Sequence, residues 1–105
     1  MDLSQTLEQK EKQKQELGYE KFKEYINQKI TKSIDSGISI VRINLDLDTI
    51  FIEHEHNCSI TQDTIDYLIG YYQSQGLTVE HIKTKGYHNQ YGGHKGENTL
   101  KIHLH

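Results

Sequence analysis

Proline, disulfide pairs and long apolar runs are all missing from this sequence of 105 residues. Its single cysteine, Cys58, cannot form an internal disulfide, which is typical of proteins kept in a reducing compartment. The first 25 residues contain no apolar run, and no stretch of about 18 apolar residues could cross a bilayer. We therefore expect a cytoplasmic protein, or one packaged from the cytosol, with no membrane association.

A strong basic charge is also missing, since the net charge is −3. Residues 1–35 carry seven lysines against seven acids, residues 36–75 carry Arg42 against six acids, and residues 76–105 carry four lysines against two acids. A protein that binds duplex DNA normally shows a much stronger basic stripe. The sequence thus predicts no duplex-DNA partner, although its mildly basic end allows a single phosphate contact.

The length fits one domain with one core. Only 33% of the residues are hydrophobic, so the core must be thin, and chains of this kind often gain stability by forming homo-oligomers. No repeat and no proline-rich or other linker divides the chain. We predict a polar helical extension over residues 1–18 and a single α+β domain over residues 19–105.

The first third of the chain favours a long helix in two parts. Residues 4–16 are good helix formers with Leu7 as their one apolar side chain, so this part should project into solvent or lie on a partner. From residue 19 onward, apolar side chains recur at four-residue spacing and should pack on a sheet: Phe22, Ile26, Ile30 and Ile34. Ser36 and Gly37 should end the helix, with Gly37 in the left-handed conformation.

The next segment alternates apolar and polar residues, which is the pattern of a half-buried strand. The inward positions are Val41, Ile43, Leu45 and Leu47. Since one strand of nearly twenty residues would be unusual, we expect a turn near residues 46–49 and a second strand over residues 50–56. These two strands would pair as a β-hairpin.

A second helix and two strands complete the expected fold. Ser59 and Gln62 resemble a capping box, and the apolar face that follows has helical spacing: Ile65, Leu68, Ile69 and Tyr72. Gly76 should close this helix, and residues 77–83 and 99–105 should form strands. The predicted fold class is α+β: a long N-terminal helix, a β-hairpin, a second helix and two further strands, in a small, mostly antiparallel sheet with helices on one face.

The connection between the last two strands, residues 83–98, gathers glycine, tyrosine, histidine and lysine. Such a loop adds nothing to a core and is typical of a surface that binds something. The candidate binding residues are Lys85, Tyr87, His88, Tyr91, His94 and Lys95. Tyrosine and glycine suit a protein contact, the rings and lysines also suit a small nucleotide, and a plain hairpin tip is the third interpretation. The fixed spacing of a phosphate-binding P-loop is missing.

Two histidine pairs are weak candidates for a metal site. His54 and His56, like His103 and His105, would each project from one face of a strand. Four imidazoles could hold zinc, but His103 and His105 alternate with inward leucines and should face solvent. With the acids beside them, His54 and His56 could instead serve a small metal-dependent phosphoesterase or nuclease. We predict no metal and no other cofactor.

Nothing in the sequence indicates a nucleophilic enzyme. No serine or cysteine lies in an elbow-like context, and His81 has no nucleophile near it in sequence. We therefore predict a protein that is not an enzyme.

Three segments resemble small α+β proteins of tailed bacteriophages: YINQKITKSIDSGISIVRINL, TIDYLIGYYQSQGLTVEHI and TLKIHLH. The matching positions are core and cap residues, namely Ile30, Ile34 and Gly37 in the first segment and Leu68, Tyr72, Gly76 and Val79 in the second. Leu77 departs from the family pattern, where an aromatic residue is usual. The resemblance implies a non-enzymatic role through protein contacts, either in virion assembly or as an inhibitor of a host factor or defence system. The protein would then act in the host cytoplasm or in the virion.

Overall fold

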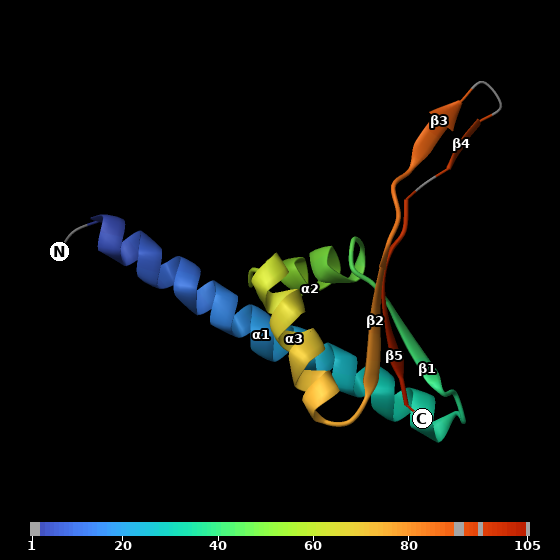
Figure 1. The fold of residues 1–105 in the computed structure, drawn as a ribbon. Coiled ribbons are helices and arrows are strands. Elements are labelled where there is room, and N and C mark those ends of the chain that lie inside the picture. The colour runs from blue at the N-terminus through green and yellow to red at the C-terminus, as the bar shows by residue number, and fades with distance from the viewer. Residues whose placement is uncertain (1–2, 90–91, 95, 105) are drawn as a thin grey trace.

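The computed structural model describes residues 3–89, 92–94 and 96–104, which form an α+β fold (Figure 1). Its elements, in chain order, are α1 (Leu3–Asp35), β1 (Ile40–Asn44), α2 (Asp48–His56), α3 (Gln62–Ser74), β2 (Thr78–Lys83), β3 (Tyr87–Asn89), β4 (Gly92–His94) and β5 (Asn98–His103). Within these residues, one antiparallel sheet has the strand order β1-β5-β2, and β3 pairs with β4 in a separate ribbon.

The helices cover one face of the three-stranded sheet. In the central strand, Leu100 and Ile102 are fully buried, and their neighbours across the sheet in β1 are the buried Ile43 and Val41. Alternate residues such as Arg42 face solvent. This period of two follows from the pleat of the strand. The predicted α+β class, the antiparallel sheet and the helices on one face are confirmed.

The core joins this sheet face to one side of α1 and of α3. Phe22 and Ile26 of α1 are fully buried, as predicted, and Leu68 and Tyr72 of α3 lie in the same cluster. The buried apolar side of α1 is shorter than predicted, because Ile34, its last predicted member, is 61% exposed.

Two projections extend from this body. The first part of α1 extends beyond the other elements (Figure 1). Its side chains from residue 7 to 16 are exposed. The β3–β4 ribbon extends beyond the sheet in another direction (Figure 1). The Cα radius of gyration is consequently 16.5 Å, against about 13 Å for a compact domain of 100 residues.

The predicted hairpin over residues 40–56 is wrong, because its second half is the helix α2. The buried side chains of this region, Leu45, Thr49 and Ile52, lie at i, i+4 and i+7, which is helical spacing. The Asn44 side chain accepts hydrogen bonds from the backbone N–H groups of residues 46 and 47, at 3.0 and 3.1 Å, and turns the chain out of β1. Asn57 ends α2 in the left-handed conformation at φ 50°, which asparagine tolerates better than most residues.

The N-cap predicted for the second helix, which is α3 in the structure, is also wrong by two residues. The capping box of α3 consists of Thr61 and Thr64, each side chain bonding the other's backbone N–H. Ser59 has a different role, since its N–H donates to the Lys14 carbonyl of α1 at 3.1 Å. The predicted left-handed conformation of Gly37, at φ 74°, is confirmed, and Gly76, which was predicted to close the second helix, has φ 88° just after α3.

Gly18 allows α1 and the α2–α3 connection to approach each other at this point. A Cβ atom added at Gly18 would lie 2.0 Å from the Ser59 carbonyl oxygen and 2.9 Å from its carbon. Real Cβ atoms are not found at such distances, so a side chain here would force the two segments apart. The absence of a side chain at residue 18 therefore allows the α2–α3 connection to lie against α1.

None of the helices in the described part of the chain is long and apolar enough to span a membrane.

Candidate binding surfaces

The predicted loop over residues 83–98 contains a hairpin, which we call the arm. The arm continues β2 and β5 past the sheet and carries β3 and β4 (Figure 1). Its backbone register places Tyr87 opposite His94, and His88 opposite Gly93. The segment connects the two predicted strands, and it contains paired strands, as the interpretation of a hairpin tip requires.

The base of the arm is fixed by backbone contacts. The Thr84 N–H donates to the Glu97 carbonyl at 2.8 Å, and the Thr84 hydroxyl accepts from the Glu97 N–H at 2.8 Å. Gly96 lies so close to the opposite chain that an added Cβ would be 2.5 Å from the Thr84 carbonyl oxygen. The two chains of the arm can run this close only because residue 96 has no side chain.

A line of three polar side chains ties this base to the turn before α2. His81 Nε2 lies 2.7 Å from Asn98 Oδ1, and Asn98 Nδ2 donates to Asp46 Oδ1 at 3.1 Å. Because the amide oxygen of Asn98 can only accept, His81 carries its proton on Nε2 in this arrangement. We call this line the arm anchor.

The structure brings most of the predicted binding residues into the arm. Lys85 is exposed between β2 and β3, while Tyr87 and His88 lie in β3 and His94 in β4. The other two predicted residues, Tyr91 and Lys95, lie outside the described residues.

The strand predicted for His54 and His56, two of the weak metal candidates, is wrong. His54 and His56 lie on α2, where residues two apart are separated by a rotation of about 200° about the helix axis. They therefore point to nearly opposite sides of the helix. His103 lies in β5, where its Nε2 contacts Glu80 Oε1 at 3.0 Å, and His105 lies outside the described residues. In the part of the chain that the structure describes, no three His, Cys, Asp or Glu side chains gather in a way that could hold a metal ion.

The cysteine and one tyrosine are titratable groups held by packing. Burial, helped by the charge of Glu53, raises the pKa of the Cys58 thiol and keeps it protonated at neutral pH. Burial also raises the pKa of Tyr72, whose hydroxyl donates to Asn27 Oδ1 at 2.6 Å. Both groups belong to the core rather than to an exposed site.

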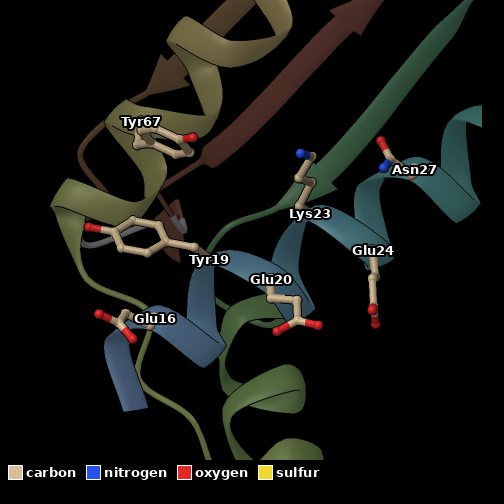
Figure 2. Close-up of a pocket in the computed structure, with 7 residues that line it drawn as sticks. All are labelled: Glu16, Tyr19, Glu20, Lys23, Glu24, Asn27 and Tyr67. Carbon is tan, nitrogen blue, oxygen red and sulfur yellow. The ribbon is translucent and has the colours of Figure 1, made fainter. Parts of the chain in front are cut away.

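A groove of about 430 Å³ runs between α1 and α3 (Figure 2). The rings of Tyr19 and Tyr67 meet edge to face across it, with centroids 5.3 Å apart. The groove is lined by Glu16, Tyr19, Glu20, Lys23, Glu24, Asn27 and Tyr67. Three carboxylates against one ammonium group give it a negative potential, which favours cationic over anionic ligands.

A further surface, on α2, escaped the sequence analysis because that segment read as a strand. Leu47, Ile50 and Phe51 are 63%, 64% and 59% exposed and lie at i, i+3 and i+4. We call these three residues the α2 patch. The signal that could have found it was Asp48 in a first turn and Asn57 at a left-handed end, which together delimit a short helix.

No family model matches the sequence, and comparisons with curated proteins and with solved structures gave no match.

Proposed function

We propose that this chain is a non-enzymatic binding protein that acts through protein–protein contacts and uses the arm as its main contact surface. The observation that carries the proposal is the position of the arm, which extends two hydrogen-bonded strands away from the body (Figure 1). A two-stranded ribbon is at best marginally stable without a core beneath it. Its place in the molecule therefore suits contact with another molecule better than support of this fold.

The composition of the arm supports the same proposal. Two of the residues predicted to bind are Tyr87 and Tyr91, and tyrosine offers a large contact area at low entropic cost. The lysines and histidines of the same segment offer hydrogen bonds and charge. The arm is also anchored rather than free, because the Thr84–Glu97 pair and the arm anchor fix its base. A fixed base reduces the entropy that binding would otherwise cost.

The partner we propose is a protein of the kind that small tailed-phage proteins contact, either a host factor or a virion component. The two predict different behaviour. A host-directed inhibitor should capture a protein from a lysate of the host bacterium, whereas an assembly component should bind purified particles.

The test removes the arm while leaving the body intact. Deleting residues 87–95 joins Gly86 to Gly96 and leaves Lys85, Gly86 and Gly96 as a three-residue turn between Thr84 and Glu97. Glycine-containing turns of this length close hairpins well. Because none of the described residues in the deleted segment belongs to the core, the armless variant should keep the circular dichroism spectrum and melting temperature of the full chain.

Binding is then compared between the full chain, the armless variant and a triple variant with Tyr87, Tyr91 and Lys95 changed to alanine. We expect the full chain to retain its partner from lysate or on particles, and both variants to lose it. Ile38→Ser, an exposed change far from the arm in sequence, is the matched control and should retain the partner. Equal capture by the full chain and the folded armless variant would refute the proposal.

A further inference from the structure

The α2 patch is an apolar surface on a helix whose other side already packs on the body. Isolated exposed apolar residues are ordinary, but here three large ones occupy adjacent positions of one turn. His54, which is exposed at i+7 from Leu47, continues the same side. The patch follows the seam spacing of helices that pack lengthwise on another helix.

Carboxylates flank this patch along both sides. With 100° between successive residues, Glu53 lies beside Ile50 on one edge, and Glu55 lies beside Phe51 on the other. Asp46 and Asp48 add negative charge at the start of the helix. An occupant should therefore offer an apolar stripe accompanied by positive charge.

The first part of α1 carries a stripe of this kind. Leu3 and Leu7 are 79% and 62% exposed, and Lys10 and Lys14 continue their spacing of four, three and four residues. We call these four residues the α1 stripe. Burial of the two exposed leucines against a partner would stabilise this part of α1.

We propose that the α2 patch of one copy of this chain binds the α1 stripe of a second copy. The nine residues of α2 and the twelve from Leu3 to Lys14 span about 14 and 18 Å of helix, so the two surfaces match in length. A two-fold dimer would make this contact twice, once in each direction.

Charge decides between this pairing and the two symmetric alternatives. Packing one α2 patch on another would bring two acidic borders together, and packing one α1 stripe on another would set its lysines against lysines or leucines. The pairing of patch with stripe sets lysines against carboxylates. Because the helices overlap only along the short α2, the interface falls at the small end of the specific range, and we expect a dissociation constant of about 10–100 µM.

Sedimentation equilibrium of the full chain, from about 1 µM to about 1 mM, measures this association. We expect wild type to dimerise across that range. The patch variant Ile50→Ser/Phe51→Ser and the stripe variant Leu3→Ser/Leu7→Ser should each bind at least about tenfold more weakly. The control Ile38→Ser, which removes a 52% exposed apolar residue elsewhere, should dimerise like wild type.

Mixing the two variants separates the proposed pairing from the alternatives. A mixed dimer contains one contact between an intact patch and an intact stripe, so the mixture should associate more tightly than either variant does alone. In a patch–patch dimer the stripe variant would dimerise like wild type on its own, and in a stripe–stripe dimer the patch variant would do so. In neither case would mixing strengthen association. The charge-reversed variant Lys10→Glu/Lys14→Glu should also weaken the dimer, and its changes lie on exposed positions that do not affect the core.

Wild type that remains monomeric at about 1 mM would overturn the proposal, and so would a mixture that stays monomeric while wild type dimerises. The contact does not involve the arm. The armless variant should therefore dimerise like wild type, so a failure of the arm hypothesis and a failure of this one are distinguishable.

Discussion

The close approach at Gly18 predicts that two glycine-to-alanine substitutions in helices will have opposite effects on stability. In an unobstructed helix interior, alanine is more favourable than glycine by about 1 kcal/mol. Gly70 of α3 is such a position, since nothing lies within 4 Å of a Cβ built there. Gly70→Ala should therefore stabilise the protein by about 1 kcal/mol.

Gly18→Ala gains the same helix propensity but meets the Ser59 carbonyl oxygen at 2.0 Å. The connection would have to move by more than an ångström, which strains packing at a cost of about 1–3 kcal/mol. That movement also breaks the hydrogen bond from the Ser59 N–H to the Lys14 carbonyl, worth about 1 kcal/mol. Subtracting the propensity gain leaves a net loss of about 1–3 kcal/mol.

Urea unfolding followed by circular dichroism measures both variants, with the m-value checked for a change in compactness. In thermal melts of a domain this size, each 1 kcal/mol moves the midpoint by about 4–8 °C. Gly70→Ala should melt a few degrees above wild type, and Gly18→Ala should melt below it. If Gly18→Ala proves as stable as Gly70→Ala, the connection does not lie against α1 and the reasoning fails.

Two further predictions concern α3 and the hydrogen bond that joins it to α1. Thr61→Ala removes the side-chain cap of α3 and should lower the free energy of unfolding by about 1 kcal/mol. Ser59→Ala, at the cap expected from sequence, should change it by less than about 0.5 kcal/mol. Equal losses in urea titrations would contradict the observed cap. Tyr72→Phe removes the hydrogen bond to Asn27 and should cost about 1 kcal/mol at pH 7. Because burial raises the pKa of Tyr72 in the folded state, the folded chain holds that proton more tightly, and stability should be lost as the pH rises above about 10. The variant should lose less stability there in pH-dependent melts, while Tyr25, whose pKa burial also raises, keeps part of the effect; an unchanged slope would contradict the assignment.

The outline of the fold could be predicted where one periodicity was unambiguous. Phe22 and Ile26 in α1, and Leu68 and Tyr72 in α3, had helical spacing, and all four are buried. Glycines at positions of positive φ marked helix ends because few other residues adopt that conformation.

The main error came where two periodicities coincide. Ile50 and Ile52 lie two residues apart, as residues on one face of a strand do, yet Thr49 and Ile52 also share one side of a helix. Only tertiary packing decides between the two, since β-branched residues enter helices when a core covers them. The α2 patch was hidden for the same reason.

The sequence allowed a hairpin tip in the arm as one of three interpretations, but it did not locate the strands β3 and β4. Three-residue strands are too short for any pattern to identify, and their pairing depends on the close approach at Gly96. The arm anchor joins Asp46 to Asn98 across 52 positions of sequence, and no local pattern could show it.

The two projections divide the chain into parts that answer to different constraints. Substitutions in the core should change how much protein stays folded, whereas changes in the arm or in the first turns of α1, the proposed contact surfaces, should cost little folding stability. A different hairpin grafted between Thr84 and Glu97 should thus be carried by the same body. In an evolving lineage, such a division lets specificity diverge quickly while the scaffold stays nearly constant.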